Sequence, residues 1–546
     1  MDRLSPDLRK AETEIDSEYT KNPLTKQPFA TAVWNLLSVV EDHVFFPIVR
    51  GDDLTRYKLE ALVDHFIFIL RHPLYWLRIS CPANGRVPNS YDPDNYEAAS
   101  ELINLSSHYD DFCMVFIYAS RGIIDVHLEE DSLSPIHNFK EQTQYEAYNR
   151  LIKPVNEGIQ NEELFAGLDH IYKQVNQSLR IRGENFAVSI NPRMVRFAME
   201  QLEPLVKQKF TLPDTWALSG YTLFDFKQVF HAISTLAYIQ FAARLLAAQR
   251  GCVGLGFANA LFLSGKDELI NRVGRYTGLS HQVVSDIVYD LTLGSNDISP
   301  DRADPALQPL ILLNEDKYAV APHLWINNAA ERNYIALINK IPTKKQIYLS
   351  LVQQKEELMR ERVVSVINNS NWQTLFGRVP GAPNLPDIDL AIIDHVEKSC
   401  LLIELKWFID PAEARELLEK GQEITKGISQ LLKFKKAFVE SNNGLLEYLG
   451  IDLTYTLGLV VTSANWIGHA SEQHPEIPVI REYHLMKKIE ITKSLSEIIF
   501  WLSERKFLPV EGSHFEIVET SRNVGKWKTL WYGIKSLIED DEFLPV

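Results

Sequence analysis

The sequence contains few cysteines, and their spacing excludes two classes of stabilising site. The four thiols, Cys81, Cys113, Cys252 and Cys400, are far apart, and no pair has Cys-x-x-Cys spacing. Zinc sites and disulfide frameworks both depend on closely spaced or regularly spaced cysteines. We therefore expect neither, and the composition favours a reducing compartment such as the cytoplasm.

Long uninterrupted apolar runs are also missing. The start of the chain, MDRLSPDLRKAETEIDSEYT, is polar and acidic, so no signal peptide is expected. The most apolar long stretch, Val229–Ala248, contains His231, Gln240 and Arg244. These polar residues predict a buried helix rather than a membrane span. We expect a cytoplasmic protein that makes no contact with a membrane.

The sequence has no phosphate-binding loop. Gly265-Lys266 is followed by Asp267 where the motif needs Ser or Thr, and position 260 is Ala where it needs Gly. Any step driven by nucleotide hydrolysis would therefore have to come from another chain.

Positive charge is in deficit, since the formal net charge is −16. Phosphate contacts supply most non-specific affinity for nucleic acid, so this charge opposes indiscriminate coating of DNA or RNA. A local basic surface can still bind it. With 45% hydrophobic and 23% charged residues, the chain has the composition of an ordinary globular protein. A chain of 546 residues is too long for one core and predicts two to four domains.

The first 340 or so residues predict a mainly α-helical region. Helical spacing or helix-forming composition is found at Leu36–Ile48, Leu54–Leu70, Tyr96–Leu105, Gln142–Ile152, Pro192–Leu205, Phe226–Ala248 and His281–Leu293. A short hairpin is expected at Leu310–Leu313 and Tyr318–Ala321. Residues 281–325 would then form a helix-hairpin unit, either winged-helix-like and touching nucleic acid or an ordinary packing element. We place the domain boundary at Asn339–Lys345, giving a helical region 1–340 and a second domain 341–546 with a C-terminal extension.

The most specific feature is a pair of apolar runs that carry acidic residues and one lysine. Pro386–Ile393 and Leu401–Lys406 flank a polar, turn-like segment and predict an antiparallel hairpin. Successive strand side chains point to opposite faces, so Glu404 and Lys406 share one face. Pairing Ile393 with Cys400 or Leu401 would put Asp389 opposite Glu404 or Leu405. Two carboxylates would then converge, which suffices for Mg²⁺.

At this point the chain resembles the PD-(D/E)XK nuclease superfamily, which has the restriction-endonuclease-like fold. The resemblance covers residues from about 350 to 465. The family core is a helix, a three-stranded antiparallel sheet, a crossover helix and a further strand. The corresponding segments here are Leu349–Ile367, the predicted hairpin, Gly421–Phe438 and Tyr455–Thr462. The resemblance implies an α/β domain with a mixed sheet flanked by helices.

The resemblance also implies roles for individual residues. Asp389 is the expected family acid, with Asp387 as the alternative because it stands beside Pro386. Asp389 and Glu404 would hold Mg²⁺, or Mn²⁺ in its place, and Lys406 would assist the attacking water. Many members add an acid from the leading helix, for which Glu361 is preferred over Glu357. Some members carry a glutamine on the crossover helix, which Gln430 matches by order, and Lys426 and Lys433 are expected to contact nucleic-acid phosphates.

The sequence as a whole therefore predicts a metal-dependent nuclease joined to a helical region that recognises a protein partner or a signal. DNA endonuclease action is preferred because most of the superfamily cuts DNA, and the resemblance implies a setting in bacterial defence against foreign DNA. Two alternatives stay open: cleavage of RNA, and a non-catalytic scaffold that retains the fold. A homo-oligomer is compatible with the sequence.

Overall fold

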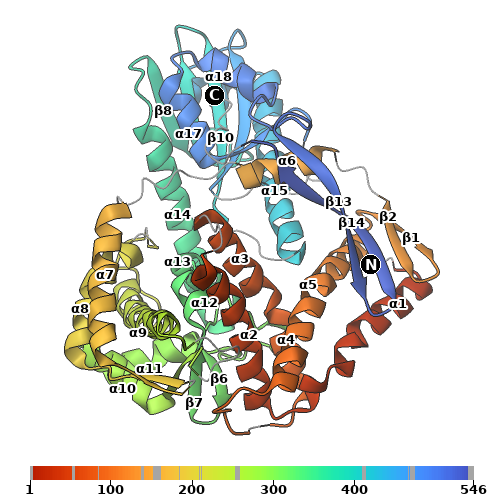
Figure 1. The fold of residues 1–546 in the computed structure, drawn as a ribbon. Helices are drawn as coiled ribbons and strands as arrows, with labels where there is room; N and C mark the ends of the chain where they lie inside the picture. The colour runs from red at the N-terminus through yellow and green to blue at the C-terminus, as the bar shows by residue number, and fades with distance from the viewer. Residues whose placement is uncertain are drawn as a thin grey trace. The chain divides into compact units, whose positions relative to one another are not determined.

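The fold is described from a computed structural model (Figure 1). It describes residues 4–51, 56–83, 85–136, 140–151, 161–183, 185–207, 209–210, 212–252, 259–408, 414–464, 467 and 474–538. The chain divides into two compact units, each built from segments that are distant in the sequence. Unit 1 comprises Met1–Arg9, Phe112–Asn156 and Leu349–Val546, and unit 2 comprises Lys10–Asp111 and Glu157–Tyr348.

Unit 2 is mainly helical, as the sequence predicts. Its helices are α2 (Phe29–Arg50), α3 (Arg56–Ile69), α4 (Arg71–Ser80), α7 (Asn161–Ser178), α8 (Pro192–Lys207), α9 (Leu223–Gln249), α10 (Lys266–Thr277), α11 (His281–Asp290), α12 (Pro322–Ile326) and α13 (Ala330–Lys340). Helices α1 (Pro6–Ser17), α5 (Pro93–Arg121) and α14 (Lys345–Ser365) cross from one unit to the other. Every helix predicted in the N-terminal region coincides with an observed one, and residues 54–55 and 152 of those predictions lie outside the described residues.

Two long helices, α2 and α9, are apolar enough to pass a test for membrane spans by length and composition. Most of each helix is buried inside the structure, at 72% and 78% of the tested window. Burial of this extent is what the central helices of a protein core have. Thr222 begins α9 with a reciprocal cap, in which its side chain accepts from Asp225 N–H and the Asp225 carboxylate accepts from Thr222 N–H.

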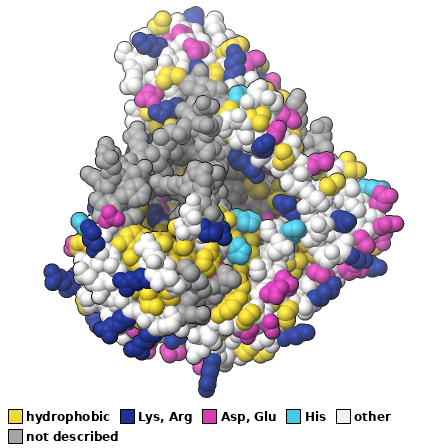
Figure 2. Space-filling view, viewed as in Figure 1, with side chains coloured by type: hydrophobic (Ala, Val, Ile, Leu, Met, Phe, Trp, Pro, Cys, Tyr) yellow, Lys and Arg dark blue, Asp and Glu magenta, His cyan; other side chains and the backbone are white. Residues whose placement is uncertain are grey.

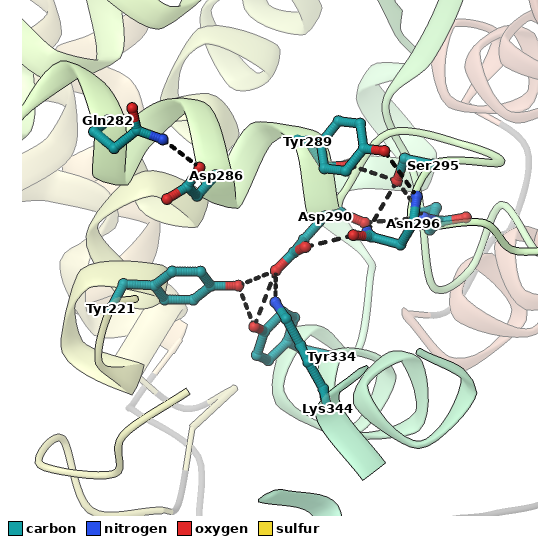
Figure 3. A network of polar contacts seen from close by, with 10 residues as sticks. Tyr221, Gln282, Asp286, Tyr289, Asp290, Ser295, Asn296, Tyr334 and Lys344 are labelled. Carbon is teal, nitrogen blue, oxygen red and sulfur yellow. Dashed lines mark hydrogen bonds and ion pairs between the residues drawn. The ribbon is translucent and has the colours of Figure 1, made fainter. Parts of the chain in front are cut away.

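A buried polar network in unit 2 surrounds Asp290, the last residue of α11 (Figure 3). One carboxylate oxygen of Asp290 accepts from the Tyr221 hydroxyl and from the Lys344 ammonium, and the other accepts from Asn296 Nδ2 at 3.1 Å. Burial, together with the neighbouring hydroxyl and carboxylate, raises the pKa of Tyr221 well above its usual value. Every group shown around Asp290 has a partner, so the network fastens α11, α13 and the turn before α9 to one another.

Unit 2 also contains two small sheets. Strands β3 (Leu179–Arg182) and β4 (Asn185–Val188) form a hairpin. Strands β5 (Phe262–Gly265), β6 (Ile311–Asn314) and β7 (Lys317–Val320) form an antiparallel sheet in the order β5-β7-β6. The predicted hairpin after α11 is therefore confirmed, and it gains a third strand that the sequence analysis did not identify.

Unit 1 contains a five-stranded mixed sheet in the order β12-β11-β10-β9-β8. Helix α14 leads into β8 (Trp372–Gly377), β9 (Ile388–Asp394) and β10 (Ser399–Lys406), which pair antiparallel. Helices α15 (Ala414–Val439) and α16 (Asn443–Leu449) then cross to β11 (Thr456–Ser463), which runs parallel to β10, and β12 (Val479–Arg481) pairs parallel with β11. The predicted helices and strands from 349 to 463 are thus confirmed as elements.

Helices cover both faces of this sheet. A Cβ on Gly458 of β11 would lie 2.6 Å from Ile499, which belongs to α18 (Leu495–Ser503). A Cβ on Gly427 of α15 would lie 3.1 Å from Glu404 Cγ on β10. Residues 458 and 404 point to opposite faces of the paired strands. Helix α18 therefore covers one face, and α15 covers the face that carries Glu404 and Lys406.

The rest of unit 1 joins a middle segment of the chain to the C-terminal extension. Strands β1 (Asp125–Glu129) and β2 (Ser132–Ile136) form a sheet with the long hairpin of β13 (Phe515–Val524) and β14 (Trp527–Ser536), in the order β1-β2-β14-β13. The remaining helices are α6 (Lys140–Leu151) and α17 (Glu482–Ile491). The sequence analysis assigned residues 112–156 to the N-terminal region, whereas in the structure they pack with the C-terminal part.

Candidate functional site

The hairpin of β9 and β10 brings Asp389 and Glu404 together. Cys400 pairs with Ile393 and Ile403 pairs with Leu390, which is one of the two registers that the sequence analysis left open. The next step along the same ladder places Asp389 across from Glu404. The Asp389 carboxylate accepts a hydrogen bond from the backbone N–H of Leu405 at 2.8 Å. This bond fixes the carboxylate at the end of β10, beside Glu404.

Glu404 and Lys406 lie on the same face of β10, as strand alternation requires. The Lys406 ammonium donates to the Glu404 carboxylate at 2.6 Å. The Glu404 side chain is 2% exposed and that of Lys406 is 17% exposed. The pair is therefore almost removed from water, in a position where an unpaired charge would be costly.

Burial shifts the pKa values of Glu404, Asp389 and Lys406. Burial and the Asp389 charge together, against the opposing effect of Lys406, raise the pKa of Glu404 to about 7. Burial also raises the pKa of Asp389, although the Leu405 N–H and Lys406 act against it. For Lys406 burial lowers the pKa, but the carboxylates of Glu404, Asp389 and Glu356 outweigh it and raise the pKa overall. Lys406, together with Arg360 at Asp389, does not offset the effect of burial on the two carboxylates, which favours binding of a further cation.

A third carboxylate comes from helix α14, and it is Glu356. Burial raises the pKa of Glu356, Lys406 lowers it and Asp389 raises it, so the side chain lies within electrostatic reach of the hairpin acids. The backbone N–H of Trp407, one residue after Lys406, also stabilises its charged form. The acidic cluster, meaning Asp389, Glu404 and Glu356, therefore combines two strands and one helix around Lys406.

The structure does not bring the predicted helix acid Glu361 to the acidic cluster. Glu361 and the alternative Glu357 are both exposed on α14. The buried stripe of α14 recurs every fourth residue, at Leu351, Lys355, Met359 and Val363. At about 100° per residue, Glu356 borders this stripe, whereas Glu357 and Glu361 lie on the far side of the helix. Lys355 belongs to this buried stripe although it is charged. Apolar patterning therefore did not show which face of α14 is buried.

The alternative strand acid, Asp387, is exposed just before β9 begins. Its charge raises the pKa of Asp389, which shows that the two carboxylates are close. Asp387 nevertheless lies outside the ladder that positions Asp389. Of the two acids, the structure places Asp389 at the buried end of the hairpin and Asp387 towards solvent.

Helix α15 reaches the acidic cluster through Gly427. A Cβ at this position would be 3.1 Å from Glu404 Cγ and 3.2 Å from Lys406 Cε, so only glycine allows the helix to pass this closely without displacing them. Gln430 follows one turn later and is half-buried, whereas Lys426 and Lys433 are exposed. The two lysines are accessible for a phosphate contact, and Gln430 lies on the part of α15 nearest the cluster.

Gly427 gives a prediction that separates activity from stability. Replacing Gly427 by Ala should raise helix propensity by about 1 kcal/mol, so the unfolding temperature should stay equal or rise. The added methyl must push Glu404 or Lys406 by a few tenths of an ångström, and displacements of this order should lower the cleavage rate by roughly three- to tenfold. Parallel assays of melting and cleavage, with the exposed Ser429→Ala on the same helix as the control, test this. Equal loss of stability and rate would contradict it.

The donor set fits a hard divalent cation. Among the described residues, no three His, Cys, Asp or Glu side chains form a group that would hold a metal by themselves. Mg²⁺ is, however, usually held by one or two carboxylates, with water and substrate phosphates as the other ligands. Asp389 and Glu404 supply that share, and burial raises the pKa of each, so a bound cation would stabilise their charged forms.

Comparison of the chain with protein-family models, with curated proteins and with solved structures finds no match. The assignment of a function therefore depends on the geometry of the acidic cluster and on the order of the elements that build it.

Proposed function

We propose that this protein is a metal-dependent nuclease that hydrolyses phosphodiester bonds, with DNA as the substrate and endonucleolytic action. The observation that carries the proposal is that the antiparallel hairpin places Asp389 beside Glu404, with Lys406 donating to Glu404 and with Glu356 of α14 within electrostatic reach. The order α14, β8, β9, β10, α15, β11 supports it, because the restriction-endonuclease-like core has the same order of helix, three antiparallel strands, crossover helix and parallel strand.

Each residue of the cluster has a separate task in this proposal. Asp389, oriented by Leu405 N–H, and Glu404 would hold Mg²⁺ or Mn²⁺. When bound, the cation supplies Lewis-acid polarisation of the phosphate and lowers the pKa of a water molecule. Lys406 would lower the pKa of the attacking water through its positive charge, or would donate a hydrogen bond to the negative charge that develops on the phosphate. Glu356 accepts a hydrogen bond from the same water and orients it.

The proposal also covers the surroundings of the site. Lys426 and Lys433 are exposed on α15 and would contact substrate phosphates, while Gln430 orients groups near Lys406. A cytoplasmic location and a role in defence against foreign DNA are the setting that the family resemblance favours. Unit 2, which is mainly helical, would supply recognition.

Cleavage assays test the proposal directly. Supercoiled plasmid, linear duplex, single-stranded DNA and RNA are incubated with the full chain in Mg²⁺, Mn²⁺ or EDTA, alongside Lys406→Ala. We expect metal-dependent cutting of the DNA substrates, with a rate reduced roughly 10²- to 10³-fold by the substitution. Lys493→Ala, an exposed lysine of unit 1, is the matched control and should cut at the wild-type rate.

Two other results would replace the proposal. Cutting of RNA in preference to every DNA substrate would make the protein a ribonuclease that uses the same residues. Absence of cutting by the wild type, or a weak activity that Lys406→Ala leaves unchanged, would favour a scaffold that retains the fold without its chemistry.

A further inference from the structure

Unit 2 contains a pair of consecutive helices beside a small antiparallel sheet. After α9, the chain runs through β5, α10, α11, β6 and β7. Strand β7 pairs on one side with β5, through Phe262 and Val320, and on the other side with β6, through Ile311 and Ala319. Two consecutive helices thus stand beside a three-stranded antiparallel sheet whose last two strands form a projecting hairpin. This is the arrangement of a helix-turn-helix with a wing.

The connection between α10 and α11 is a three-residue turn that contains glycine. Gly278 has a φ of 75° and caps α10, donating its N–H to Gly274 C=O at 2.9 Å. Ser280 caps α11, because its hydroxyl accepts from Val283 N–H at 3.3 Å. Val273 on α10 and Val284 on α11 are buried and hold the pair together. A short turn with glycine and an apolar inner face is what a helix-turn-helix motif has.

The outer face of α11 is polar. His281, Gln282 and Tyr289 are exposed, and Ser285 and Asp286 are half-buried. Gln282 donates to the Asp286 carboxylate at 2.8 Å, which holds the two side chains in a defined position on the surface (Figure 3). Hydrogen-bonding side chains at the start of the second helix are the groups that read base edges in the major groove, and glutamine pairs well with adenine.

Exposed cations flank this helix pair. Lys266 and Arg275 belong to α10, Arg193 and Arg196 to α8, and Arg180 and Arg182 to β3. Helix α8 packs against α10, and Asn259, just before β5, donates to Phe186 C=O of β4 at 2.6 Å, so the β3–β4 hairpin adjoins the segment that leads into β5 and α10. Figure 2 shows dark-blue side chains at the lower left of the view, where Figure 1 places α8, α10 and α11.

Within the part of the chain that the structure describes, these arginines have no acidic partner. None of Arg180, Arg182, Arg193, Arg196 and Arg275 forms an ion pair with an acidic residue in the described part of the chain. Arg196 and Arg275 contact only carbonyl oxygens of their own helices. Unpaired guanidinium groups on a chain with a net charge of −16 are suited to an anionic partner. The wing tip, by contrast, carries Glu315 and Asp316, so phosphate contacts are expected from the arginines and not from the wing.

We propose that this surface of unit 2 binds duplex DNA, with α11 in the major groove and the arginines of α8, α10 and β3 on the phosphate backbone. The inference adds a DNA-recognition site to the proposed nuclease and names duplex DNA as the form that it is brought to. It rests on the proposed function only in that a nuclease gives this DNA binding a use. Recognition by α11 itself needs neither the acidic cluster nor a metal.

The test measures binding without cleavage. Fluorescence anisotropy of the full chain with a labelled duplex of random sequence is recorded in EDTA over a series of KCl concentrations. The triple substitution Arg193→Ala, Arg196→Ala and Arg275→Ala should weaken binding at least tenfold at low salt. It should also reduce the slope of log affinity against log salt by nearly one for each phosphate that an arginine no longer neutralises, or about 2 to 3 in all.

A matched control removes two exposed cations elsewhere in unit 2, through Arg86→Ala and Lys26→Ala, and should leave both quantities unchanged. Equal affinity and slope for the triple variant and the wild type would overturn the proposal, as would wild-type protein that fails to bind duplex DNA. Stronger competition by single-stranded RNA than by duplex DNA would overturn it too. Because no metal is present, failure here is distinct from failure of the nuclease assay.

Discussion

Replacing Glu404 by Gln should abolish DNA cleavage and yet make unit 1 more stable at alkaline pH. The loss of activity follows from the removal of a carboxylate that holds the cation and pairs with Lys406 at 2.6 Å. Removal of one such group should lower the rate by roughly 10²- to 10³-fold. The variant keeps the size and shape of the side chain, so the fold should be retained.

The gain in stability follows from the pKa of Glu404. Folding raises this pKa from 4.5 to about 7, because burial opposes the charged form. A carboxyl group with a raised pKa binds its proton more tightly in the folded state, so its contribution to stability is favourable at low pH and is lost as the pH rises from about 4.5 to about 7. Above that range the wild type carries a buried charge that glutamine does not have.

The size of the effect can be bounded. One pKa unit corresponds to about 1.4 kcal/mol, so the shift sets an upper limit of about 3 kcal/mol. In the variant Lys406 loses its carboxylate partner, and this loss offsets part of the stabilisation. We therefore expect the free energy of unfolding to rise by about 1–2 kcal/mol at pH 8. Chemical denaturation at pH 5 and pH 8 measures it. The exposed Glu357→Gln is the control, and a difference between variant and wild type that does not grow with pH would contradict the account.

The second large effect is expected in unit 2, where Lys344→Met should destabilise the protein by about 3–5 kcal/mol. Lys344 donates to the Asp290 carboxylate, whose side chain is only 5% exposed. Methionine preserves the length of the side chain but leaves Asp290 buried with a negative charge that no cation neutralises. Tyr221 and Asn296 continue to donate, but neither carries a positive charge (Figure 3).

A control on α11, the helix that ends at Asp290, makes this prediction specific. Asp286 is bonded to Gln282 near the surface, and Asp286→Asn should change the stability by less than about 0.5 kcal/mol. Thermal and denaturant unfolding of both variants measures the difference. A cost for Lys344→Met that is as small as that for Asp286→Asn would show that the network does not depend on the ion pair.

Comparison of sequence and structure shows which inferences local physics supports. The positions of Asp389, Glu404 and Lys406 follow from strand alternation and from a short polar turn, and both act over a few residues. The contribution of Glu356 does not follow in this way, because it depends on how α14 is rotated about its axis. That rotation is fixed by buried contacts that include Lys355, a residue that apolar patterning overlooks.

Long-range assembly was the other part that could not be predicted. Nothing within residues 112–156 indicates that β2 pairs with β14, since Ser132 meets Lys528 across nearly four hundred residues of chain. The buried network of Asp290 has the same character, because Tyr221, Tyr334 and Lys344 come from separate elements. Hydrophobic periodicity identifies helices, but it does not state which distant segment each one meets.

The most direct test of the central claim is a calorimetric titration of Mn²⁺ into the full-length wild type and the Glu404→Gln variant. The claim that Asp389 and Glu404 form a cation site predicts a saturable binding event in the wild type that is absent or at least tenfold weaker in the variant. Glu357→Gln, one residue away from Glu356 on the exposed side of α14, should bind as the wild type does. Identical isotherms for the wild type and Glu404→Gln would contradict the claim that this cluster binds the metal.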